Sequence, residues 1–168
     1  MVGSKHLLRT RIIASVALVA AAACRAQPPR LTDGATSLDD LTARYVTAVL
    51  AGDTAGMHRL RVTAHEHNAV MWPEFPASRR NFPVDVAWHN IDTRSIREAV
   101  HIREQYAGDS FDVVGTTCRD GVTAYDTFRV HGDCWVTLRR GSRPSDVKLF
   151  GSVVEMDGRF KVIGIRTD

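Results

Sequence analysis

The spacing of apolar residues predicts two helices at the start of the domain. Ser37 can cap the first helix, because its hydroxyl can accept a hydrogen bond from a free amide of the first turn. Gly52 suits the C-terminal end of that helix, and a second, shorter helix with Met57 and Leu60 follows it. The apolar stripe of the first helix consists of Leu38, Leu41, Tyr45, Ala48 and Val49.

The next two segments predict a strand and a third helix. In residues 82–90, apolar and polar positions alternate, which is typical of a strand. Its apolar face consists of Val84, Val86 and Trp88. Residues 92–107 predict a helix that Gly108 ends, with a buried stripe of Ile96, Ala99, Val100 and Ala107.

After Gly108 the apolar period changes to two, which predicts a series of strands. The predicted strands are 111–118, 127–131, 134–140, 147–155 and 160–166, and Asp157-Gly158 is typical of a two-residue hairpin turn. Helices followed by consecutive strands favour an α+β fold. We expect three N-terminal helices packed on a curved antiparallel sheet of about five or six strands.

The N-terminus predicts export. Three basic residues precede the uncharged apolar run 12–23, which is the layout of a secretory signal. A helix over this run would rise only about 18 Å, short of the roughly 30 Å hydrocarbon core of a membrane. The sequence Ala21-Ala22-Ala23-Cys24 resembles the lipobox of bacterial lipoproteins, although Ala21 replaces the usual leucine.

This resemblance implies cleavage before Cys24, fatty-acid lipidation of Cys24 and attachment to a membrane of the bacterial cell envelope. Ala21 and Ala23 would also suit an ordinary signal peptidase, which would give a secreted or soluble periplasmic protein. Residues 24–36 contain a double proline and few apolar residues, which predicts a flexible tether. Residues 37–168 then form a single domain.

The charge of the chain does not indicate nucleic-acid binding. The full sequence has 22 basic and 19 acidic side chains. The signal, residues 1–23, contains three basic residues and no acidic ones, so 22 − 3 leaves 19 basic and 19 acidic residues after cleavage. The high isoelectric point therefore belongs to the signal, and no nucleic-acid partner is expected.

The chain has three cysteines. If Cys24 is lipidated, Cys118 and Cys134 remain as a pair outside the reducing cytosol and can form a disulfide between neighbouring strands. The alternative is two free, buried thiols that pack as small apolar side chains.

The segments VLAGDTAGMHRL (49–60) and KLFGSVVEMDGRFKVIGI (148–165) resemble the nuclear transport factor 2-like superfamily. MWPEFP (71–76), together with the second segment, resembles small exported bacterial members of it. The superfamily includes polyketide cyclase-like and ketosteroid isomerase-like proteins, and the resemblance covers about residues 37–167. It implies a cone-shaped α+β domain with an interior that can hold a ligand, and a possible homodimer through the sheet.

The segment His65-Glu66-His67 looks like a metal site, but its spacing does not fit one. A zinc-protease helix needs His-Glu-x-x-His, and the position of its second histidine is occupied by Ala69. Thr63-x-x-Glu66 instead matches a capping box, which predicts a helix over 64–71 that ends at Trp72 before Pro73. We expect no metal or cofactor, and His65 at the surface.

His67 is the candidate for chemistry. On a continuous helix it shares an apolar stripe with Leu60, Ala64 and Met71, so we expect it to point inward. Either it is a buried, hydrogen-bonded core residue, or it is an acid or base in a pocket.

Other residues could line the same pocket: Asp85, Trp88, Arg103, Tyr106 and His131. An isomerase mechanism would need a carboxylate base opposite a hydroxyl or protonated acid, and no spacing selects a pair from Asp85, Asp126, Tyr106 and Tyr125.

Two hypotheses follow. The first is a non-catalytic envelope domain that binds a small molecule or a protein. The second is an isomerase, cyclase or hydratase that uses His67 as a base. Catalysis requires His67 to meet Asp85, Arg103 or Tyr106 at an open pocket, whereas a filled interior favours protein binding.

Overall fold

The computed structural model describes residues 30–167, so the signal sequence and Cys24 lie outside the described residues. The α-helices of this part are α1 (Leu38–Leu50), α2 (Thr54–Arg59) and α3 (Val84–Tyr106). Between α2 and α3 lie the π-helical turn η1 (Glu66–Met71) and the 3₁₀ turns η2 (Trp72–Glu74) and η3 (Ser78–Arg80).

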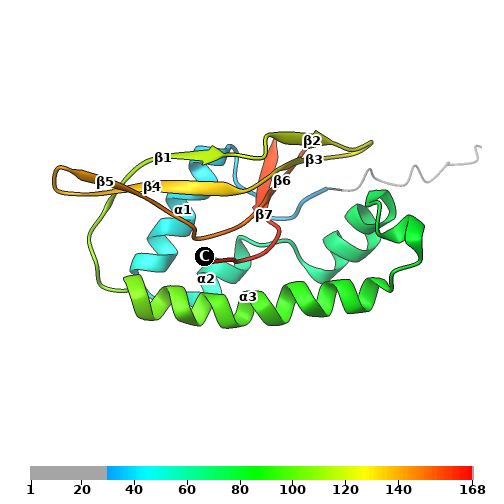
Figure 1. Ribbon diagram of the computed structural model, residues 1–168, viewed down its shortest axis with the longest axis horizontal. Helices are drawn as coiled ribbons and strands as arrows, with labels where there is room; N and C mark the ends of the chain where they lie inside the picture. The colour runs from blue at the N-terminus through cyan, green and yellow to red at the C-terminus, as the bar shows by residue number, and fades with distance from the viewer. Residues whose placement is uncertain (1–29, 168) are drawn as a thin grey trace, which may run out of the picture.

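The strands of residues 30–167 form two antiparallel sheets. One sheet has the order β1 (Asp112–Cys118), β4 (Cys134–Arg140), β5 (Arg143–Val147). The other has the order β2 (Val122–Ala124), β3 (Arg129–His131), β6 (Val153–Met156), β7 (Arg159–Val162). Figure 1 shows α2 and α3 below the strands, with α3 along most of the length of the molecule, and α1 crossing the view of β1 and β4. The predicted α+β class is confirmed.

Helix α1 forms as its sequence predicts. The Ser37 hydroxyl accepts a hydrogen bond from the Asp40 amide at 3.0 Å, and Gly52 adopts a positive φ of 66° just after the helix. Such a φ favours glycine, because a side chain would be strained there. The buried face of α1 includes Leu41, Tyr45 and Val49.

The strand predicted over residues 82–90 is wrong, because Val84 begins α3. Pro83 precedes the helix as its N-cap, and the helix continues without interruption to Tyr106. The alternation of Val84, Val86 and Trp88 was ambiguous, since residues four apart also share one face of a helix. The two predicted elements, 82–90 and 92–107, are therefore one helix.

The buried stripe predicted for this helix is also largely wrong. Ser95, Ala99 and Ile102 are buried, whereas Ile96 and Val100 are exposed. Ser95 donates a hydrogen bond to the Ile91 carbonyl and accepts one from the Ile165 amide at 3.1 Å. Small residues thus face the C-terminal segment, because the backbones approach closely there.

Residues 31–36, which the sequence assigned to the tether, pack on the domain. Leu31 and Ala35 are buried, and Ala35 exchanges backbone hydrogen bonds of 2.9 Å with Phe160 of β7. Arg30 is exposed, and the packing on the domain begins at Leu31. This segment closes the edge of the second sheet with an isolated bridge.

The predicted strands differ from the observed ones mainly at their ends. The predictions 111–118 and 134–140 match β1 and β4, and 127–131 contains β3. The predictions 147–155 and 160–166 are longer than β6 and β7, and β2 and β5 were not predicted. The Asp157-Gly158 turn joins β6 to β7 with positive φ angles of 49° and 68°, as expected for this dipeptide.

The interior of the described residues has two apolar clusters. The main core lies between α1, α3 and the strands around Tyr45 and Phe150, whose ring centroids are 5.1 Å apart. The second cluster lies under η1 and the second sheet, and its buried members are Leu31, Val62, Met71, Phe128, Val154 and Met156.

Cys118 and Cys134 form the predicted disulfide. The two residues lie directly opposite each other at the ends of β1 and β4. Cys134 is fully buried in the main core. The bond therefore joins two paired strands across sixteen residues of sequence.

Candidate functional site

Thr63 and Glu66 form the predicted capping box. The Thr63 amide donates to the Glu66 carboxylate at 2.6 Å, and the Glu66 amide donates to the Thr63 hydroxyl at 3.1 Å. The helical segment that follows is a π-helix over Glu66–Met71, and Trp72 and Pro73 continue into a 3₁₀ turn. The residue that suggests catalysis in the sequence is thus a structural residue.

Glu66 also holds distant parts of the chain together. Its Oε1 atom accepts hydrogen bonds from the Thr32 amide at 2.7 Å and from the Thr32 hydroxyl at 3.0 Å. The Lys161 ammonium lies 3.0 Å from Oε2, and both side chains of this pair are 3% exposed. Burial alone would raise the pKa of the Glu66 carboxyl, but the Thr63 and Thr32 amides and Lys161 outweigh burial and lower that pKa.

His67 is buried, as expected. The continuous helix from Leu60 on which this expectation rested is absent, because α2 ends at Arg59 and Ala64 is exposed. Its Nδ1 atom lies 2.6 Å from the Asn68 side-chain oxygen. Its ring centroid is 5.7 Å from that of Trp72, 6.2 Å from that of Phe75 and 5.3 Å from that of Trp88. Burial lowers the pKa of His67, because the cationic form loses its hydration. His67 is thus a buried imidazole enclosed by aromatic rings.

Arg61 is a buried charged residue that the sequence did not reveal. Its guanidinium bonds to the His58 Nδ1 atom at 2.8 Å and to the Asp92 carboxylate at 3.2 Å. It also lies 5.8 Å from the ring centroid of Trp88. The sequence did not reveal this residue, because an arginine just after the apolar Leu60 resembles any surface arginine. Its partner Asp92 on α3 is also far away in sequence.

Two buried polar atoms near Arg61 have no partner among the described residues. They are the Arg61 Nε atom and the Tyr45 hydroxyl. Burial raises the pKa of that hydroxyl, and the positive charge of Arg61 opposes the effect only in part. An unpaired buried polar group costs about 1–3 kcal/mol of folding free energy, so these two atoms destabilise the main core locally.

Several predicted pocket residues lie away from His67. Asp85 is exposed on α3, and Arg103 near the end of this helix pairs loosely with Glu104 at 4.0 Å. Tyr106, at the C-terminal end of α3, packs against Phe111 with ring centroids 6.1 Å apart. Of the predicted set, only Trp88 contacts His67.

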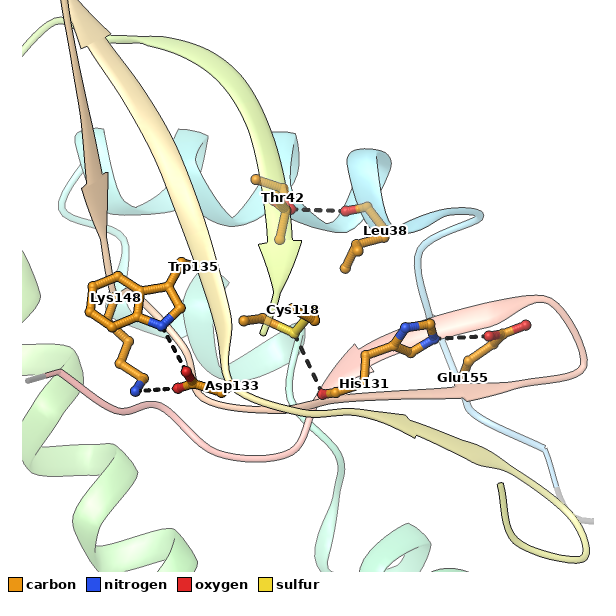
Figure 2. The surroundings of a disulfide bond; sticks show 10 residues. Leu38, Thr42, Cys118, His131, Asp133, Trp135, Lys148 and Glu155 are labelled. Atoms are coloured by element: carbon orange, nitrogen blue, oxygen red, sulfur yellow. Dashed lines mark hydrogen bonds and ion pairs between the residues drawn. A yellow bond between two sulfur atoms is a disulfide. The ribbon is translucent and has the colours of Figure 1, made fainter. Parts of the chain in front are cut away.

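His131 belongs to a different place, at the end of β3. Its Nε2 atom lies 2.9 Å from the Glu155 carboxylate, and its ring packs on Phe160 at 5.9 Å. Figure 2 shows this pair near the disulfide, on the opposite side from Asp133 and Trp135.

The surface hollows do not coincide with these groups. Five of the hollows on residues 30–167 have none of His67, Asp85, Trp88, Arg103 and His131 in their lining, whereas the predicted residue Tyr106 lines one of them. The largest measures about 750 Å³ and is lined by Arg30, Asp33, Asp157 and Arg159 among others. The next, about 560 Å³, includes Tyr106, Phe111 and Arg140.

Within residues 30–167 there is no group of three or more histidine, cysteine, aspartate or glutamate side chains that could hold a metal ion. In the same part of the chain, no helix combines the length and the apolar character of a membrane span.

The chain matches no protein-family model, no curated protein and no solved structure. The candidate residues therefore have to be judged from their own geometry.

Proposed function

We propose that the protein is an exported, lipid-anchored domain of the bacterial cell envelope that binds another protein through its outer surface. In this proposal the domain is a cone of the nuclear transport factor 2-like type, and Cys24 carries the lipid. The order of the helices and antiparallel strands supports the cone, and the signal-like N-terminus supports the anchor.

The filled interior is the observation that carries this proposal. Bulky side chains with less than 2% exposure occupy the space between the helices and the strands, among them Tyr45, Phe150 and Met57. The His67 imidazole is enclosed by rings, and among the described residues its one hydrogen-bond partner is the Asn68 side chain. A base needs to reach its substrate, so this geometry supports surface binding over an interior acid–base reaction.

The outer face of α3 is the candidate binding surface. Ile96 and Val100 are one helical turn apart, and Ile96 is 52% exposed. The buried face of α3 is a different one, with Ser95, Ala99 and Ile102. Apolar side chains that a helix presents to water can bind a protein partner, whereas a small ligand would need a concave site.

Photo-crosslinking in intact cells tests this function. A photo-crosslinking amino acid replaces Ile96 in one variant and Val114 in a control. Val114 is 54% exposed on β1, so the two sites are matched in exposure. We expect a defined protein adduct from position 96 and none from position 114.

An adduct of twice the mass of the chain would identify a homodimer instead of a second protein. Equal labelling at both positions, or none at either, would contradict binding through α3. The anchor is tested separately, because the mature protein should carry the mass of the lipid and a Cys24→Ser protein should lose both that mass and its membrane association.

A further inference from the structure

We propose that residues 78–86, the Phe82 loop, dock on an anionic membrane surface. In this arrangement Phe82 and Val86 enter the interface between headgroups and acyl chains, and Arg79 and Arg80 meet lipid phosphates. The inference rests on the proposed anchor at Cys24 and adds a second, non-covalent contact with the same membrane.

The loop presents apolar and basic side chains side by side. Phe82 is 45% exposed and Val86 is 42% exposed, and Arg79, Arg80 and Pro83 are exposed next to them. A single exposed apolar residue is ordinary on a protein surface. An exposed aromatic flanked by arginines is different, because it combines apolar burial with attraction to anionic headgroups.

The loop is held in shape before any contact. The Ser78 hydroxyl donates to the Phe75 carbonyl at 2.8 Å, and the Phe82 amide donates to the Ala77 carbonyl at 3.3 Å. Asn81 turns the chain with a left-handed φ of 56°. The Phe82 ring rests against Trp72, with centroids 6.2 Å apart, so docking would not need to order the loop first.

The charge of the loop suits an anionic surface. Arg79 and Arg80 form no ion pair with any residue of 30–167 within 4.0 Å. Arg79 lines a hollow together with Glu74 and Asp126. The Glu74 carboxylate is not bonded to Arg79 there, because it accepts hydrogen bonds from the Asp126 and Thr127 amides. Asp85 is the exposed acid of the loop itself, which leaves the loop with a net positive charge.

The tether places this loop near the membrane. From Cys24 to Leu31 the chain advances 31 − 24 = 7 residues. At 3.3–3.6 Å per residue, it spans at most about 25 Å. Leu31 is buried in the second cluster, and Phe75 packs against that cluster. The ring of Phe75 is 6.4 Å from the ring of Trp72, and Trp72 in turn supports Phe82.

The loop and the start of the described chain therefore share one end of the molecule. Figure 1 shows the start of the described chain in the same half as the short helical turns before α3.

Fluorescence quenching by brominated lipids tests the docking. The mature chain, made without lipidation, has Cys24 as its one cysteine outside the Cys118–Cys134 disulfide. Cys24 can therefore be coupled to vesicles that contain a maleimide lipid. The vesicles consist of phosphatidylcholine with or without phosphatidylglycerol, and their lipids carry bromine near the headgroups. On these vesicles, the fluorescence of a Phe82→Trp variant is compared with that of Val114→Trp and of the unaltered chain.

We expect the added fluorescence of Phe82→Trp to be quenched on anionic vesicles, and that of Val114→Trp to remain. Arg79→Glu with Arg80→Glu should weaken the contact about tenfold or more, since each basic residue near an anionic surface contributes favourably. Arg79→Lys with Arg80→Lys should retain the contact.

Equal quenching at positions 82 and 114, or equal quenching on neutral and anionic vesicles, would overturn the proposal. Because chemical coupling replaces natural lipidation, a negative result here is independent of whether Cys24 is lipidated in cells. A photo-crosslinked protein at position 82 in place of lipid contact would likewise overturn it.

Discussion

The two clusters of the interior are stabilised in different ways. The main core packs aliphatic and aromatic side chains of α1, α3 and β4 against one another. The second cluster is bordered by buried charged or titratable residues: Arg61, Glu66, His67 and Lys161, all at most 3% exposed. The difference follows from the backbone around each cluster.

Regular helices and strands satisfy their own amides and carbonyls, so the backbone around the main core needs few side-chain partners. The second cluster is covered only partly by strands, and the irregular segments around Thr32 and Thr63 have amides that need other partners. Glu66 supplies them for Thr32 and Thr63, and Lys161 balances its charge. The second cluster should therefore depend on a few specific polar contacts, and the main core on its volume.

The largest effect is expected from Lys161→Met. The substitution leaves the buried Glu66 carboxylate without its cation, and breaking a buried pair from one side costs about 3–5 kcal/mol of unfolding free energy. Urea denaturation at neutral pH measures this. Leu41→Met in the main core is the matched control, because an exchange that conserves volume costs less than about 1.5 kcal/mol.

Replacing both partners, Glu66→Gln with Lys161→Met, should recover part of the loss, since no unpaired charge remains. The comparison between the clusters would be wrong if Lys161→Met were no more costly than Leu41→Met.

The sequence predicted those contacts of this architecture that form between residues close together in the chain. Thr63 and Glu66 are three residues apart, and Asp157 and Gly158 are adjacent, so short-range geometry alone determines their roles. Glu66 and Lys161 are 95 residues apart, and Arg61 and Asp92 are 31 apart. Nothing in a single sequence pairs residues over such distances.

The error in α3 has a related cause. Both faces of this helix carry apolar residues, so periodicity alone did not identify the face that packs. Ser95 and Ala99 are buried because small side chains let α3 approach the C-terminal segment, whereas the larger Ile96 remains outside. His67 was correctly predicted to point inward, but the rings of Trp72 and Trp88 that enclose it depend on how distant segments meet.

Removal of the disulfide is expected to have the next largest effect, and it acts on the main core. Cys118→Ala with Cys134→Ala opens a loop with a sequence separation of 16, and closure of such a loop stabilises a protein by about 3 kcal/mol. Urea denaturation of this variant measures the loss. A reducing agent should destabilise the natural protein by a similar amount and leave the variant unchanged. A reducing agent that affected the variant equally would show that the loss does not come from this bond.

The smallest effect is a pH dependence that separates the clusters. Burial lowers the pKa of His67 below its ordinary value of 6.5, so below pH 6.5 the unfolded chain binds more protons than the folded one. The stabilisation is therefore complete above pH 6.5 and is lost as the pH falls toward the folded pKa, with a slope of at most about 1.4 kcal/mol per pH unit. His58 contributes with the same sign, because burial and Arg61 lower its pKa as well.

His67→Gln should therefore reduce the slope of unfolding free energy between pH 6.5 and pH 5 without abolishing it, since His58 still titrates. Glu66 acts in a separate window. Its pKa is lowered from 4.5, so its contribution is present above pH 4.5 and is lost as the pH falls through the lower folded value. Urea denaturation at a series of pH values resolves the two windows. If the slope of unfolding free energy against pH above pH 5 were unchanged in His67→Gln, the imidazole would reach water in the folded protein. That result would support an accessible base at position 67.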